Sequence, residues 1–91
     1  MPVRVHLKIS GRVQGVCFRH YCREQAAHFG VKGFVRNNDD GSVEAIAEGT
    51  EEAVMKFAAW CRRGPTLAAV LACEEKRETP TGEFDSFAIR D

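Results

Sequence analysis

Apolar and polar residues alternate along four segments of the chain, the pattern typical of β-strands with one buried face. The first segment runs from about Val3 to Ser10 and places Val5, Leu7 and Ile9 on one side. Similar patterns cover residues 31–38, the segment that begins at residue 43, and part of residues 70–79. Residues 84–89 can add a short final strand. The pattern therefore predicts a sheet of four strands with a short extra strand at its C-terminal end.

The gap between the first two strands carries a helical pattern. Phe18, Cys22, Ala26 and Phe29 recur at spacings of four, four and three, which places them on one face of a helix. Gly30 stands where a residue of left-handed conformation commonly ends a helix. We therefore expect a helix from about residue 18 to residue 29.

A second helical pattern follows the third strand. Thr50 is a good N-cap, and the two acidic residues after it complement the positive end of a helix dipole. The sequence Gly64-Pro65 ends the pattern. The apolar stripe between these signals consists of Val54, Phe57, Ala58 and Cys61.

The order β-α-β-β-α-β predicts an α+β domain of the ferredoxin-like type over residues 1–91. In that fold an antiparallel sheet has the strand order 4-1-3-2, and both helices cover one face. The first and second strands then run parallel with the third between them, so the end of the second strand lies at the same edge as the loop after the first. Asn37 stands at that end and shares a face with Val35. We expect Asn37 to face this loop.

Charge and composition narrow the function classes. Thirteen basic and thirteen acidic residues cancel, which argues against nucleic acid or an anionic membrane surface as the main partner, because both attract a basic excess. No segment has the pattern of a signal peptide or a transmembrane helix. The four cysteines contain no C-x-x-C pair. We expect a cytoplasmic monomer with reduced thiols.

The segment Gly11–Arg19, with the sequence GRVQGVCFR, joins the first strand to the first helix. Its two glycines can adopt conformations that other residues avoid, so successive N–H groups can turn toward one point. The helix start adds free N–H donors and the positive end of its dipole. Arg19 adds a planar fork of donors that fits phosphate. From spacing alone, two interpretations stay open: a phosphate site, and a tight turn beside a solvated arginine.

Three segments resemble the acylphosphatases, small enzymes that hydrolyse carboxyl–phosphate anhydrides. They are GRVQGVCFR at residues 11–19, GFVRNNDDGSVEA at residues 33–45 and FDSFAIR at residues 84–90. The resemblance covers nearly the whole chain. Two departures are mild: Phe34 stands where a tryptophan is common in the family, and Cys17 occupies a position that varies.

The resemblance implies the ferredoxin-like fold, no metal or cofactor, and water as the nucleophile. It also implies that Arg19 binds the substrate phosphate and that Asn37 holds the attacking water, whereas Asn38 faces the other way on strand alternation. Inorganic phosphate would be both product and competitive inhibitor. Because an acyl phosphate has a good leaving group, we expect catalysis mainly by positioning and by neutralising charge. The main-chain N–H groups expected to hold the phosphate are those of Gly15, Val16, Cys17, Phe18 and Arg19.

Other interpretations compete with this one. Cys17 and Arg23 form a C-x₅-R pattern, as in cysteine phosphatases, but the five residues between them contain no glycine and belong to the helical pattern. Cys17, His20 and Cys22 could ligate a metal, although their spacing is poor and Cys22 lies on the apolar stripe.

A nucleic-acid-binding sheet is the remaining alternative for this topology. Such sheets need stacking aromatic residues and basic neighbours on the open face. The face opposite the helices offers Phe34 and Arg36, but also the acidic Glu44 and Glu48. This sign of charge disfavours RNA.

Overall fold

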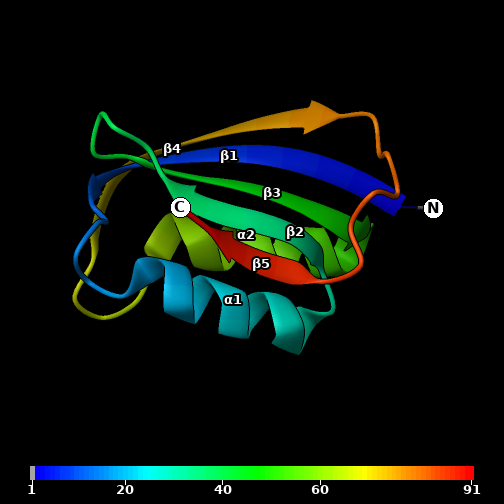
Figure 1. Cartoon of the computed structure of the whole chain (residues 1–91), viewed down its shortest axis with the longest axis horizontal. Coiled ribbons are helices and arrows are strands. Elements are labelled where there is room, and N and C mark those ends of the chain that lie inside the picture. Colours follow the sequence, from blue (N-terminus) through cyan, green and yellow to red (C-terminus); the bar gives the residue numbers. More distant parts are fainter. Residues whose placement is uncertain (1) are drawn as a thin grey trace.

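Five strands and two helices follow one another in the order that the sequence predicts (Figure 1). The computed structural model describes residues 2–91. The first helix has the predicted bounds, and the strands differ from their predicted segments only near their ends. The elements are β1 (Pro2–Arg12), α1 (Phe18–Phe29), β2 (Lys32–Asn37), β3 (Val43–Thr50), α2 (Glu51–Arg63), β4 (Ala69–Glu78) and β5 (Phe87–Arg90).

The strands form one sheet in the order β4-β1-β3-β2-β5. β1 pairs antiparallel with β3 and β4, and β3 pairs antiparallel with β2, so β1 and β2 run parallel as predicted. The sequence pattern assigned no neighbour to β5, which lies parallel to β2 at the edge of the sheet. The sheet is therefore mixed rather than purely antiparallel. The ferredoxin-like α+β fold is confirmed.

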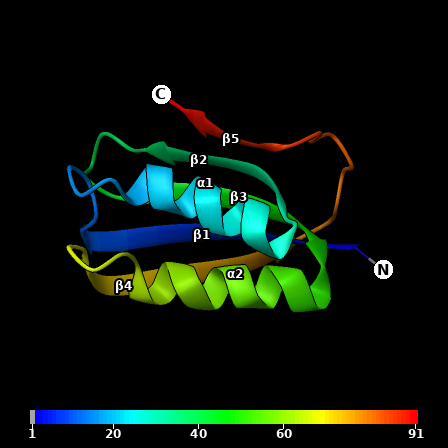
Figure 2. The ribbon, with the colours of Figure 1, turned by 90° about the horizontal axis from the view of Figure 1, so that it is seen from below.

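Both helices cover the same face of this sheet (Figure 2). Alternate residues of the central strands point toward them and are fully buried, as are Cys22 of α1 and Phe57 of α2. Burial of each of the larger side chains stabilises the folded state by about 1.5–3 kcal/mol. The inward row on the two central strands consists of Val5, Leu7, Ile9, Val43, Ala45 and Ala47.

The predicted helix ends are present. Gly30 adopts a left-handed conformation, with φ 80°, and its N–H donates to the carbonyl of Ala26. Thr50 caps α2, because its hydroxyl accepts a hydrogen bond of 3.2 Å from the N–H of Ala53. Two glutamates occupy the first turn of α2. Both sequence signals therefore mark the ends they were expected to mark.

The face opposite the helices is more covered than the sequence indicates. The chain leaves β4 at one edge and must reach β5 at the other, so residues 79–86 pass the end of the sheet (Figure 1). Phe84 lies against Phe34, with ring centroids 6.1 Å apart. The guanidinium of Arg90 lies 4.1 Å from the centre of the Phe34 ring. The expectation of an exposed face is wrong at Glu48, which is 7% exposed.

Candidate active site

The edge at which β1 and β2 both end carries an open cavity of about 340 Å³. It brings together most of the residues that the sequence singled out, from the loop after β1, the start of α1 and the end of β2. Val16 is an exception, because it lines a separate groove beside Tyr21 and Trp60. The residues lining the cavity are Val13, Gly15, Cys17, Phe18, Arg19, His20, Asn37 and Ile89.

Two residues of the loop have left-handed backbone conformations. Gly15 has φ 76°, and Cys17 has φ 60° and ψ 28°. Glycine adopts this conformation freely, whereas for cysteine it is uncommon and costs about 1–2 kcal/mol. Alternation of left- and right-handed residues turns successive N–H groups toward one side and makes a concave anion site. The strain at Cys17 therefore accompanies the curvature that such a site needs.

Gly11 does not belong to this curved loop. It lies within β1, opposite Val70 of β4, at a shift of register that follows Ser10. Its φ is 121°, and a Cβ added there would lie 2.3 Å from the carbonyl oxygen of Ala69. The interpretation of Gly11 as part of the anion loop is wrong: this glycine allows β4 to approach β1 closely.

The N-terminus of α1 has open donors. In the part of the chain that the structure describes, the main-chain N–H groups of residues 15–20 donate no hydrogen bond, and the first helical bond runs from the N–H of Tyr21 to the carbonyl of Cys17 at 3.1 Å. No side chain caps the helix, and its first turn has no acidic residue. Free N–H groups and the helix dipole both favour an anion here.

Arg19 adds the donors of its guanidinium to these main-chain N–H groups, and it lines the same cavity. Its Nη1 donates a hydrogen bond of 3.1 Å to the carbonyl of Arg90 and lies 3.7 Å from Oδ1 of Asp91. Its side chain is 31% exposed. A guanidinium has five N–H donors, so one bond to a carbonyl orients the group and leaves donors for a ligand. The C-terminal residues therefore hold Arg19 at the cavity.

Asn37 is the last residue of β2 and pairs with Val43 of β3. It shares a strand face with Val35, which is fully buried beneath the helices, and its side chain lines the cavity. Asn38 turns away, because its side-chain amide donates a hydrogen bond of 2.9 Å to the hydroxyl of Ser42. The strand alternation thus separates the two asparagines in the way the sequence predicts.

Gln14 belongs to the site although the sequence did not mark it. Its side-chain amide donates to the carbonyls of Asn38 and Ser42, at 2.8 and 2.9 Å. These bonds connect the loop between β1 and α1 to the turn that follows Asn37. A glutamine in a polar loop gives no signal of this role, because both partners are main-chain atoms.

The competing cysteine sites are not formed. Residues 18–23 are helical, so the segment between Cys17 and Arg23 cannot wrap a phosphate, and Arg23 lines a different cavity. Cys22 is completely buried. No group of three or more His, Cys, Asp or Glu side chains within residues 2–91 is arranged to hold a metal ion. Within the same range no helix is long and apolar enough to cross a membrane.

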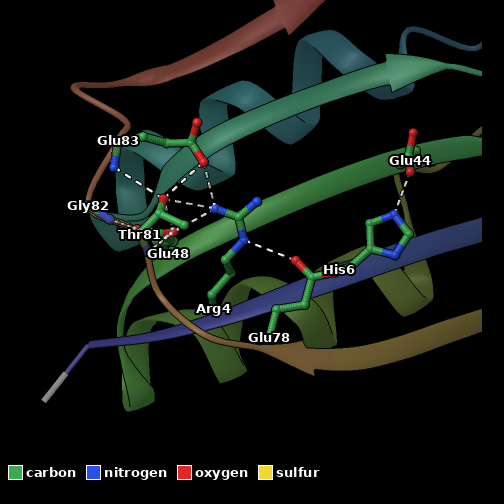
Figure 3. Close-up of polar contacts among 8 residues, drawn as sticks. All are labelled: Arg4, His6, Glu44, Glu48, Glu78, Thr81, Gly82 and Glu83. Atoms are coloured by element: carbon green, nitrogen blue, oxygen red, sulfur yellow. Dashed lines mark hydrogen bonds and ion pairs between the residues drawn. The ribbon is translucent and has the colours of Figure 1, made fainter.

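A second arginine, at the opposite end of β1, is already engaged by carboxylates of the protein itself. Nη1 of Arg4 lies 2.8 Å from Glu48 and 3.0 Å from Glu83, and its Nε lies 3.0 Å from Glu78 (Figure 3). The hydrogen bond to Glu48, together with the other carboxylates, raises the pKa of Arg4 despite its burial. We call Arg4, Glu48, Glu78, Thr81 and Glu83 the Arg4 cluster. Its charges are already paired, so it is structural.

This fold and cavity define an α+β protein with an open cavity at a helix N-terminus, where free N–H donors and an arginine favour a small anion. A family model described as Acylphosphatase matches residues 5–89. Acylphosphatases from Chloroflexus aurantiacus and Thiobacillus denitrificans are 53% and 56% identical to this chain, covering 96% and 94% of it and 95% and 94% of their own length. The chain therefore belongs to the acylphosphatase family, as the sequence resemblance indicated.

The solved structures agree with this assignment. The crystal structure of acylphosphatase from Bacillus subtilis is similar with a TM-score of 0.93 at 30% sequence identity, covering 98% of this chain and 99% of that one. An acylphosphatase from Coxiella burnetii has a TM-score of 0.92 at 31% identity, covering 98% of this chain and 93% of the other. The family consists of hydrolases that cleave carboxyl–phosphate bonds, so this chain is an enzyme of that class.

Proposed function

We propose that the chain hydrolyses acyl phosphates in the cavity described above, with water as nucleophile. The N–H groups of the loop from Gly15 to Arg19 and the guanidinium of Arg19 bind the phosphoryl oxygens. The side-chain amide of Asn37 orients the water. The single observation that carries this proposal is that open N–H donors, one guanidinium and one carboxamide line the same cavity.

In the proposed reaction the oxygen of water forms a bond to phosphorus while the bond from phosphorus to the acyl oxygen breaks. The products are a carboxylate and inorganic phosphate. Because the leaving carboxylate is weakly basic, it departs without a proton. No carboxylate is among the described residues that line the cavity, and the ring of His20, which does line it, lies 3.3 Å from the carboxylate of Glu24. In this proposal an oxygen of the phosphoryl group takes the proton from water.

Charge neutralisation supplies most of the catalysis in this scheme. A hydrogen bond to a charged group contributes about 1.5–3 kcal/mol, and loss of one preorganised donor commonly costs about 10²–10³-fold in rate. The loop and Arg19 provide several such donors without a metal. Inorganic phosphate fits the same donors, and we propose that it inhibits competitively. We also propose a monomer in the cytoplasm, where the four cysteines stay reduced.

Benzoyl phosphate hydrolysis in excess chelator tests this scheme. We expect turnover in the presence of chelator and competitive inhibition by inorganic phosphate. Asn37→Ala should lower kcat by about 10²-fold and leave the inhibition constant for phosphate nearly unchanged. Gln25→Ala is the control, because Gln25 carries the same kind of amide and lines a different groove. Equal losses in the two variants would contradict the role of Asn37.

A further inference from the structure

One side chain joins the loop that lines the cavity to the hairpin turn that follows Asn37. Gln14, directly before Gly15, donates both hydrogens of its amide, at 2.8 Å to the carbonyl of Asn38 and at 2.9 Å to the carbonyl of Ser42. Among residues 2–91, no other side chain connects the loop to this turn by hydrogen bonds. Beyond the main-chain pairing of β1, β3 and β2, the connection therefore depends on a single amide.

The hairpin that receives these bonds is internally braced. The N–H of Asn38 donates to the carbonyl of Ser42 at 2.8 Å, and the side chain of Asn38 donates to the hydroxyl of Ser42 at 2.9 Å. Asp40 accepts hydrogen bonds from both the N–H and the hydroxyl of Ser42, and these bonds, helped by Lys8, lower the pKa of Asp40. Ser42 is 4% exposed. These bonds hold the turn in one conformation directly after Asn37, its neighbour in the chain.

We infer that Gln14 is a positioning residue for the hydrolysis, acting through this turn on Asn37. The inference rests on the proposed function, in which the loop holds the phosphate and Asn37 holds the water. The water must stand in line with the bond that breaks, and a misplacement of about 1 Å costs on the order of 10²-fold in rate. Gln14 constrains the distance between the two groups because it begins on the phosphate loop and ends on the turn next to Asn37.

The test replaces Gln14 by Met, which has similar length and no N–H donors. We expect Gln14→Met to lower kcat for benzoyl phosphate about 10- to 100-fold per folded molecule, while the inhibition constant for inorganic phosphate changes less than about threefold. Gln25→Met is the matched control: Gln25 is a half-buried glutamine on α1 that lines a different groove. It should keep the wild-type kcat. A merely structural role would lower the folded fraction and leave kcat per folded molecule unchanged.

A double-mutant cycle identifies the route of the effect. In the Asn37→Ala background, Gln14→Met should lower kcat by less than about threefold, because the group it positions is already missing. An equal loss in both backgrounds would overturn the inference. If Asn37→Ala itself keeps full activity, the proposed role of Asn37 fails. If Asn37→Ala loses activity but Gln14→Met keeps it, only the role of Gln14 fails.

Two further variants test the same inference if Gln14→Met does not fold. Gln14→Lys retains donors that can reach the two carbonyls, whereas Gln14→Glu has the length of glutamine and presents only acceptors at neutral pH. We expect kcat per folded molecule to be at least tenfold higher for Gln14→Lys than for Gln14→Glu. Equal values, or the reverse order, would overturn the inference.

Discussion

The two ends of the sheet use the same kinds of polar group in opposite ways. At the end where β1 begins, the Arg4 cluster pairs every charge: Arg4 contacts three carboxylates, and its side chain is only 13% exposed (Figure 3). The N-terminus of α2 at this end is capped by Thr50. At the end where β1 finishes, the N-terminus of α1 has no cap, and Arg19 makes one hydrogen bond to a carbonyl.

This difference separates the structural Arg4 from Arg19, for which we propose a role in phosphate binding. Burial of a charge is costly unless it is paired, so the Arg4 cluster stabilises the fold only as a complete set. Donors without partners, by contrast, stabilise nothing until an anion arrives. A helix N-terminus and an arginine therefore indicate a binding site when the protein supplies no buried anion of its own; the carboxylate of Asp91, 3.7 Å from Arg19, is fully exposed. Substitutions at the two ends should accordingly affect different quantities, stability at one and activity at the other.

The largest effect is expected for Arg19→Gln, at the open end. The variant loses the charge and most of the fork that faces the phosphate, so kcat/KM should fall about 10³-fold, which corresponds to about 4 kcal/mol of barrier. Phosphate inhibition should weaken as well. The free energy of unfolding should change by less than about 1 kcal/mol, because Arg19 makes one bond to a carbonyl.

Arg23→Gln is the control for Arg19, since Arg23 is an exposed arginine on the same helix and lines another cavity. Steady-state kinetics and urea unfolding of both variants measure the two effects. If Arg19→Gln lost stability and activity together while Arg23→Gln lost neither, Arg19 would belong with the structural arginine.

The opposite pattern is expected for Arg4→Gln. Removing the cation leaves Glu48, with a side chain 9% exposed, beside two other carboxylates without their common partner. Breaking such a pair should lower the free energy of unfolding by about 3 kcal/mol. The kcat per folded molecule should stay within about twofold of wild type, because the cluster lies at the far end of the sheet.

Arg36→Gln provides the control for Arg4. Arg36 also pairs with a glutamate, Glu44, but its side chain is 48% exposed, so its loss should cost less than about 1 kcal/mol. If both variants lost the same free energy of unfolding in urea, the Arg4 cluster would stabilise the fold no more than an exposed ion pair does.

The sequence predicts one end of the sheet better than the other, for a physical reason. Local signals mark Thr50, Gly30 and the alternation that aims Asn37 at the cavity, because each depends on neighbours a few residues away. Arg4 has the pattern of an ordinary solvated residue on an alternating strand. Its partners lie as many as 79 residues away. Glu48 and Glu78 stand opposite it on the neighbouring strands, and Glu83 joins them because residues 79–86 pass the end of the sheet.

The site shows the same division. Residue types and spacing mark Arg19 and the loop only as a candidate phosphate site, and the family resemblance was needed to choose between the two interpretations. The contribution of Gln14 has no such signal, because its partners are main-chain carbonyls, which every residue has. The role assigned to Gly11 was wrong for a related reason. A side chain at this position would collide with β4, a strand that is distant in the sequence.

Acid should weaken the paired end before it affects the open end. Burial opposes ionisation of Glu48, but hydrogen bonds from the N–H of Thr81, from Arg4 and from the N–H of Gly82 outweigh it and lower its pKa. A carboxyl whose pKa is lower in the folded state stabilises the protein above its ordinary pKa and loses this contribution as the pH falls through the folded-state value. The free energy of unfolding should therefore decline below about pH 4.5.

Glu48→Gln tests the source of this decline. Each proton taken up on unfolding adds about 1.4 kcal/mol per pH unit to the slope, so removing Glu48 should flatten the curve by up to that amount. The remaining slope comes from Asp40, Glu44, Glu52 and Glu83, whose pKa values are also lowered. Urea unfolding from pH 3 to pH 7 measures the free energy of unfolding as a function of pH. An unchanged slope in Glu48→Gln would show that Glu48 does not contribute to the decline.

The smallest effect is expected for Cys17→Gly, which tests whether the loop acts through its backbone. Glycine adopts the left-handed conformation of Cys17 without strain but gains freedom in the unfolded chain, and these contributions of about 1 kcal/mol nearly cancel. The side chain of Cys17 donates nothing in the proposed reaction, so kcat/KM should stay within about threefold of wild type. Cys17→Asp should lose about 10²-fold, because its carboxylate would supply the anion that the open helix end lacks. Complete loss in Cys17→Gly would instead indicate a thiol nucleophile, and the contrast between the two ends would then rest on Arg19 alone.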